Sequence, residues 1–76
     1  KGIHAAELDL LNRAGAQFVV LGKPNHWVLA AERAGGSLGT LQKARGGERE
    51  FSTLDAAMNL LFREGIERFI VRITGS

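Results

Sequence analysis

The sequence predicts an α+β domain with two helices on one face of a mostly antiparallel sheet of about four to five strands. Two segments, 4–14 and 52–64, carry apolar residues at helical spacing, and each is followed by a glycine. Short apolar runs rich in Val, Ile and Phe lie between and after them, separated by Gly, Pro and Asn. The expected order of elements is therefore α-β-β-β-β-α-β, in a single domain spanning residues 1–76.

The first part of the chain predicts a helix and a hairpin. Residues 4–14 favour helix, and Gly15 is the expected end of that helix. The nearly unbroken apolar run at 17–21 is typical of a central strand, and 27–33 follows as a second strand. Turn residues between the two strands predict a loop of about five residues at 22–26.

The middle of the chain predicts a second, less regular pair of strands. The glycine-rich residues 34–40 are expected to be a flexible connection. A strand is then expected at 41–45, a turn at 46–47, and a returning strand at 48–51.

The second helix and the strand after it carry the strongest signals. Ser52 is the expected N-cap, with Asp55 three residues later on the positive end of the helix dipole, and Gly65 is the expected end. The apolar stripe of this helix consists of Leu54, Ala57, Met58 and Leu61. In the strand expected at 68–73, alternation directs one set of residues toward the core (Phe69, Val71 and Ile73) and the other set away from it (Arg68, Ile70 and Arg72).

The two helix ends resemble each other. The segment 10–15 is similar to the segment 60–65, and a phenylalanine, Phe18 or Phe69, follows each terminal glycine. One interpretation is that helix, glycine and strand recur because they are a common structural unit. The other is that the two units are equivalent and that their strands lie side by side. Under either interpretation both helices pack on one face of one sheet.

Composition limits the classes of function. The 76 residues include no cysteine, which excludes disulfides and thiolate metal sites and makes a cytoplasmic location the expectation. No apolar run approaches the roughly 20 residues that a membrane helix needs, so we expect no membrane partner. The chain begins at Lys1 rather than at a methionine, which is compatible with a fragment of a longer protein. The net charge of +2 permits nucleic-acid binding without requiring it.

No residue pattern indicates catalysis or a cofactor. The loop 35–40 lacks the lysine that a phosphate-binding loop places before its Ser or Thr. His4 and His26 are expected on the surface, at a helix start and in a turn, rather than together at a metal ion. The acidic residues are scattered, and the spacing suggests no Ser/His/Asp arrangement. We therefore expect a protein that is not an enzyme and that uses no metal and no cofactor.

Basic residues gather near two of the expected turns. They are Lys23, Lys43, Arg45 and Arg49, with Trp27 beside the first turn. Such a surface can contact phosphates while the Trp27 ring stacks on a base, which predicts a nucleic-acid interface. The alternative is an ordinary mixed surface neutralised by nearby glutamates, with Trp27 in the core. These glutamates are Glu48, Glu50 and Glu67.

The last strand offers a different surface. Ile70 lies between Arg68 and Arg72, on the face that is expected to point away from the helices. One interpretation is an uncovered sheet face or edge that binds a partner protein or a second copy of the chain. The other is that Ile70 is one of the isolated apolar residues that ordinary surfaces expose.

A recognisable order of features runs from residue 44 to 57 and then from 65 to 69. It consists of a basic glycine turn, a helix start of Phe-Ser-Thr-Leu-Asp, then Gly-Ile and Arg-Phe. In this order the segment from about Trp27 to Ile73 resembles the ParC-type partition-associated proteins of bacterial plasmids and integrative elements. The resemblance covers over half of the chain. It implies a bacterial mobile-element setting and a role in DNA maintenance, with no catalytic residue to carry over.

Two functions follow as hypotheses. The first is a non-enzymatic accessory domain of a plasmid or mobile element that binds DNA or a DNA-bound partner. Its contact residues would be Lys23, Trp27, Lys43, Arg45 and Arg49. The second is a protein-interaction or homodimerisation domain that acts through the last strand. Its contact residues would be Arg68, Ile70 and Arg72.

Overall fold

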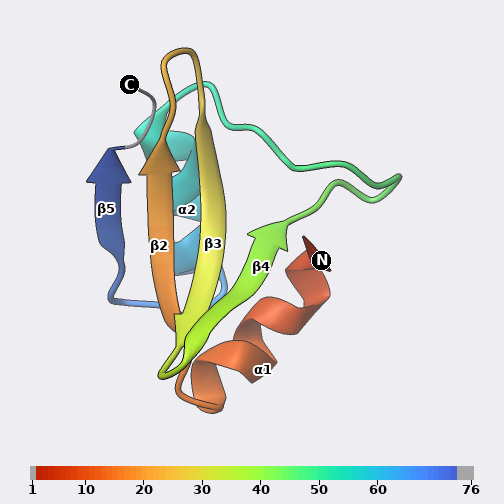
Figure 1. Cartoon of the computed structure of the whole chain (residues 1–76), viewed down its shortest axis with the longest axis vertical. Coiled ribbons are helices and arrows are strands. Elements are labelled where there is room, and N and C mark those ends of the chain that lie inside the picture. Colours follow the sequence, from red (N-terminus) through yellow and green to blue (C-terminus); the bar gives the residue numbers. More distant parts are fainter. Residues whose placement is uncertain (1, 74–76) are drawn as a thin grey trace.

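A mixed sheet of five strands, in the order β1-β4-β3-β2-β5, forms the centre of the molecule (Figure 1). The computed structural model describes residues 2–73. In chain order the elements are β1 (Gly2–Ile3), the 3-10 helix η1 (Ala5–Glu7), α1 (Leu8–Arg13), β2 (Gln17–Gly22), β3 (Trp27–Arg33), β4 (Gly36–Leu41), α2 (Leu54–Arg63) and β5 (Ile70–Ile73). The strands β2, β3 and β4 pair antiparallel, whereas β1 is parallel to β4 and β5 is parallel to β2. The predicted α+β class is confirmed.

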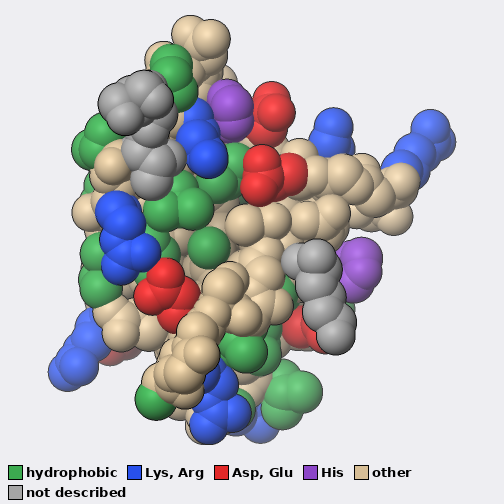
Figure 2. Space-filling model, in the orientation of Figure 1, with side chains coloured by type: hydrophobic (Ala, Val, Ile, Leu, Met, Phe, Trp, Pro, Cys, Tyr) green, Lys and Arg blue, Asp and Glu red, His purple; other side chains and the backbone are tan. Residues whose placement is uncertain are grey.

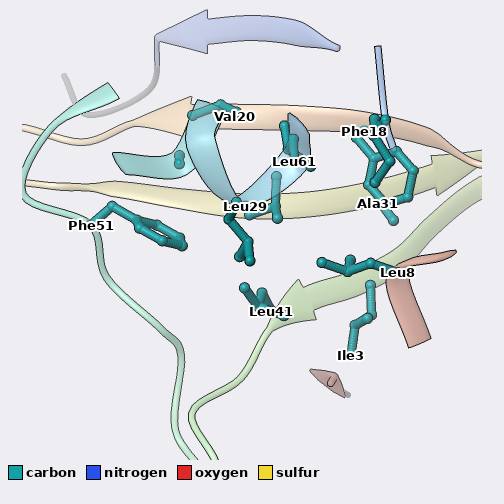
Figure 3. Close-up of a cluster of buried hydrophobic side chains, with 12 residues drawn as sticks. Ile3, Leu8, Phe18, Val20, Leu29, Ala31, Leu41, Phe51 and Leu61 are labelled. Carbon is teal, nitrogen blue, oxygen red and sulfur yellow. The ribbon is translucent and has the colours of Figure 1, made fainter. Parts of the chain in front are cut away.

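Both helices contribute to one core on one face of the sheet. Its buried members are Ile3, Leu8, Phe18, Val20, Leu29, Ala31, Leu41, Phe51, Ala57, Leu60, Leu61 and Ile66. Leu8 comes from α1 and Leu61 from α2, and in Figure 3 Leu8 lies with Ile3 near β4 while Leu61 and Val20 lie near β2. Each large apolar side chain removed from water in this way stabilises the fold by roughly 1.5–3 kcal/mol.

The opposite face of the sheet carries an ion pair that crosses strand β2. Arg72 Nη1 on β5 donates a hydrogen bond to Glu32 Oε2 on β3 at 3.0 Å. In the strand register Arg72 lies opposite Leu21, and Glu32 lies opposite Gln17. The ion pair therefore crosses β2 at the level of Val19. Val19, Val28 and Ala30 are buried on this face, which α2 does not cover. Figure 2, drawn from this side, shows hydrophobic side chains over the sheet with basic and acidic side chains beside them.

Both helices end at the glycines that the sequence predicts, but the N-cap of α2 differs from the prediction. Gly15 and Gly65 end the two helices with φ values of 91° and 80°, which only glycine adopts without strain. The N-cap of α2 is Thr53 and not the predicted Ser52. The Thr53 side-chain oxygen accepts a hydrogen bond from the Ala56 backbone N–H at 3.1 Å. Serine and threonine both cap helices well, so residue type alone cannot decide between neighbours.

The position of this cap is testable with two matched substitutions. Thr53→Ala is expected to lower the free energy of unfolding by about 1 kcal/mol, because it removes the acceptor for one backbone donor. Ser52→Ala, at the exposed neighbouring position, is expected to change it by less than about 0.5 kcal/mol. Urea denaturation of both variants measures the difference. Equal losses would show that the cap is shared or misplaced.

The predicted flexible connection after β3 is wrong, because most of it is β4. Residues 36–41 pair antiparallel with β3, and only the turn at 34–35 separates the two strands. The pairing register shifts next to Ala31, where Leu38 is the extra residue of a bulge. Gly36 and Gly39 have φ values of 141° and 129° there. Glycine is a weak strand former, so the partner strand rather than local preference makes this segment a strand.

The two strands predicted at 41–45 and 48–51 are also wrong. Of these residues only Leu41 belongs to a strand. Beyond it the structure has two isolated bridges, one between Gln42 and Glu48 and one between Phe51 and Trp27 of β3. The order α-β-β-β-β-α-β is therefore corrected to β-α-β-β-β-α-β, with η1 leading into α1. The polar and glycine-rich composition of 42–50 gives it no apolar face to bury, and residues 43–50 are all exposed.

The similarity between the two helix ends has a structural counterpart. β2 and β5 each follow a helix and a glycine, and they lie side by side in parallel register, with Val19 opposite Ile70. The second of the two interpretations, that the strands of the two units are neighbours, is confirmed. β5 is an edge strand, and β2 lies between it and β3.

Candidate functional site

The loop after β4 is a tight basic turn, which we define as residues 42–49. Its ends are joined by the Arg49 backbone N–H, which donates to the Leu41 carbonyl at 2.8 Å. Inside it, the Lys43 N–H donates to the Gly47 carbonyl at 2.8 Å, and the Gly46 N–H donates to the Lys43 carbonyl at 2.9 Å. Gly46 and Gly47 have φ values of 93° and 85°, so the reversal needs both glycines. These bonds fix the loop although its side chains are exposed.

A second set of contacts holds the basic turn against the start of the chain. The Gln42 N–H donates to the Ile3 carbonyl at 2.8 Å, which continues the pairing of β1 with β4. His4 follows Ile3, and its backbone N–H donates to the Glu7 Oε1 atom at 2.7 Å. The sequence therefore brings His4 beside the basic turn through the short strand β1.

A half-open cleft of about 340 Å³ lies between these two segments. Its lining residues are His4, Ala5, Gln42, Lys43, Ala44 and Arg49. Lys43 and Arg49 are basic residues, and the cleft lining contains no carboxylate. With His4, these residues border one small hollow, and their side chains carry N–H donors, which suit a phosphate oxygen better than a cation.

Arg49 is held in place by an aromatic ring. Its guanidinium carbon lies 5.0 Å from the centre of the Phe51 ring, within the range of a cation–π contact. Phe51 is buried, and its backbone exchanges two hydrogen bonds of 2.8 Å with Trp27. The cationic group therefore rests on a ring that the core fixes, which reduces the rotamer freedom that Arg49 would lose on binding.

Acidic residues reduce the charge of the basic turn but do not cancel it. Between residues 42 and 49 three cations, Lys43, Arg45 and Arg49, stand against one carboxylate, Glu48, which leaves 3 − 1 = +2. Glu50 lies beyond the turn, with its Oε2 atom 3.8 Å from His26 Nε2. The local charge of +2 equals the formal charge of the whole chain, so the turn is a concentrated part of the basic surface.

The structure brings together three of the five predicted nucleic-acid contacts. Lys43, Arg45 and Arg49 share the basic turn, which projects at the right of Figure 1. Lys23 belongs to the β2–β3 turn at the top of the same view, so it is not part of that cluster. Basic side chains are visible along the projecting loop in Figure 2. The cations therefore form one cluster and one separate site.

Trp27 lies where the core interpretation expects it. The residue is half-buried and packs against the core cluster. A Cβ atom at Gly22, on the neighbouring strand, would lie 2.8 Å from the Trp27 ring, so the ring occupies the space that a side chain there would need. Base stacking by Trp27 stays a prediction, and the cluster of cations does not depend on it.

Two of the three predicted contacts of the last strand, Arg68 and Ile70, line one cleft, and Arg72 lies apart from it. Arg68 lines a second half-open cleft of about 660 Å³ at the ends of the two helices. The other lining residues are Asn12, Gly15, Ala16, Gln17, Glu67, Phe69 and Ile70. Arg72 is engaged by Glu32 on the open face of the sheet. Ile70 is 38% exposed and is part of the cleft lining.

His4 is the member of the candidate site that sequence reasoning missed. It is expected on the surface and is indeed exposed, but nothing in its local sequence links it to the basic turn about 40 residues later. The link is the parallel pairing of β1 with β4, which only the fold reveals. Within residues 2–73 no three His, Cys, Asp or Glu side chains come close enough to hold a metal ion.

Comparisons with known proteins add no functional assignment. No family model, no curated protein and no solved structure matches the chain. Of the helices in the described part of the chain, none has the length and apolar character needed to cross a membrane.

Proposed function

We propose that the protein is a non-enzymatic accessory domain that binds the phosphate backbone of duplex DNA through the basic turn and the cleft beside it. The observation that carries the proposal is the convergence of Lys43, Arg49 and His4 on one hollow without a carboxylate in its lining. A setting in a bacterial plasmid or mobile element, as implied by the ParC-type resemblance, is part of the same proposal. A DNA-bound protein is the alternative partner for the same surface of this chain.

The geometry favours contact with phosphate over base readout. The basic turn is short and exposed, and its reversal at Gly46 and Gly47 carries no side chain that would reach deep into a groove. Arg45 extends from the turn, while Lys43 and Arg49 border the cleft. Contacts of this kind position a protein on DNA and carry little sequence information. We therefore expect binding that depends steeply on salt and weakly on sequence.

The proposal is tested by fluorescence anisotropy with a short labelled DNA duplex over a range of salt concentrations. A double variant, Lys43→Gln with Arg49→Gln, is expected to bind more weakly and to flatten the slope of log K against log [salt] by about 1.8. Each phosphate that the protein neutralises adds about 0.9 to that slope, and the variant neutralises two fewer. The slope is informative because it reports the number of neutralised phosphates as well as the affinity.

The matched control removes the same charge elsewhere. Arg33 ends β3 and Arg63 ends α2, and both are exposed and lie outside the cleft. The double variant Arg33→Gln with Arg63→Gln is expected to keep the slope of the parent protein. Thermal melts show whether each variant is folded. No duplex binding by the parent at low salt, or equal slopes for the two double variants, would overturn the proposal.

A further inference from the structure

The large hydrophobic side chains left exposed in residues 2–73 are concentrated around β5. They are Leu10, Phe62, Ile70, Val71 and Ile73. The last three form most of β5, and the Phe62 ring on α2 lies 6.3 Å from the ring of Phe69, which precedes β5. Leu10 lies on α1 and has no such link to β5 among the ring contacts of the described residues. Four of the five exposed residues thus belong to one side of the molecule, which is unlike random scatter on a surface.

The outer edge of β5 also lacks the usual protection of an edge strand. No strand in the described part of the chain pairs with that edge, which forms the left border of the sheet in Figure 1. Natural edges are commonly protected by shortness, by bulges, by proline or by outward charges. The opposite edge, β1, has only two residues. β5 has four residues and no proline, and its one charged side chain, Arg72, is paired with Glu32.

The sequence of β5 is complementary to itself. In an antiparallel pair centred on Val71, that residue faces Val71 of the partner subunit, and Phe69 faces Ile73 of the partner subunit. These are the residues on the helix face of the sheet, so apolar side chains meet apolar side chains. On the open face Ile70 meets the stem of the partner's Arg72, whose charge Glu32 already balances.

Neighbouring registers are less favourable. A pair centred on Ile70 would place Arg68 opposite the partner's Arg72, and a pair centred on Arg72 would place two arginines directly opposite each other. Like charges facing each other across two strands are destabilising. The register centred on Val71 avoids both repulsions and keeps each face of the sheet continuous, because residues of the same face lie opposite each other.

We propose that two copies of the chain associate through antiparallel pairing of β5, centred on Val71, into one continuous sheet. The interface is isologous, since the same strand edge serves both subunits. Phe62, which is 53% exposed, lies beside Phe69 and is covered when Ile73 of the partner subunit packs there. This inference does not rest on DNA binding, because the basic turn borders β4 and β1, at the other side of the sheet.

Sedimentation equilibrium of the 76-residue chain provides the first test. We expect a mass of 2 × 8.2 = 16.4 kDa for the parent chain. Ile73→Arg, at a position that is 74% exposed, is expected to give the 8.2 kDa monomer without unfolding it. The matched control is Leu10→Arg, at a position that is 66% exposed on α1, and it is expected to stay dimeric. A monomeric parent chain, or a dimer that persists in Ile73→Arg, would overturn the proposal.

A cross-linking experiment tests the register. The natural chain has no cysteine, so Val71→Cys introduces a single thiol. At the centre of the proposed pair the two Cβ atoms would lie about 4.5–5.5 Å apart, close to disulfide geometry. Mild oxidation is therefore expected to yield a covalent dimer from Val71→Cys and none from Leu10→Cys. Equal cross-linking of both variants, or of neither, would contradict the proposed arrangement.

Discussion

Phe18→Ala is expected to lower the free energy of unfolding by roughly 3–5 kcal/mol, the largest effect expected from a single substitution in this chain. Phe18 is 1% exposed, lies on the helix face of β2 and belongs to the core cluster. Its removal loses the transfer free energy of a ring and leaves a cavity that the surrounding strands cannot close. A domain of this size has a total stability of only about 5–15 kcal/mol, so the variant is expected to lose a large fraction of it.

Two other phenylalanines provide graded controls for that result. Val19 lies opposite Ile70 in the sheet, and a phenylalanine, Phe18 or Phe69, comes directly before each of them. Phe69, however, is only half-buried. Its truncation is expected to cost less than that of Phe18, although the alternation of residues 68–73 directs Phe69 toward the core. Phe62 is 53% exposed, and its truncation is expected to cost about 1 kcal/mol or less. Urea denaturation should rank the three variants in this order, and a Phe69 loss equal to that of Phe18 would contradict it.

Leu61→Ala is the second large effect, with an expected loss of roughly 2–5 kcal/mol. Leu61 is fully buried and, with Ala57 and Leu60, anchors α2 in the core over β2 and β3 (Figure 3). The helix has a polar outer surface, so packing of this face rather than helix preference holds it to the sheet. Circular dichroism during thermal melting measures the loss.

A matched leucine separates burial from residue type. Leu10 lies on α1 and is 66% exposed, so Leu10→Ala is expected to leave the melting temperature within a few degrees of the parent value. If Leu61→Ala melted like Leu10→Ala, then α2 would not be fixed to the sheet through Leu61.

The sequence predicts those elements whose local signals agree with their surroundings. The helix ends at Gly15 and Gly65 follow from chain geometry, and the apolar runs of β2 and β3 follow from burial on both faces. β4 is missed because Gly36 and Gly39 have poor strand preference, and only the partner β3 makes them pair. β1 is missed because two residues are too few to show a pattern.

The candidate site shows the same division between local and non-local information. The basic turn is visible in sequence, since Lys43, Arg45 and Arg49 surround two glycines. The cleft is not visible, because it requires His4 to be carried there by the pairing of β1 with β4. Likewise, the engagement of Arg72 by Glu32 joins residues 40 positions apart. No periodicity or spacing rule predicts a contact of that range.

The parallel pairing of β2 with β5 has a consequence for the order in which the sheet opens. β2, β3 and β4 follow one another through short turns, whereas β5 reaches β2 only after the rest of the described chain has been placed. Strands that close long loops bear a larger entropic cost, and short edge strands are the first to open. Backbone amides of β2 that face β5 are therefore expected to exchange with deuterium faster than those that face β3. Pairing of β5 with a second copy would slow that exchange. The exchange rate of these β2 amides would therefore measure association, although β2 lies outside the interface.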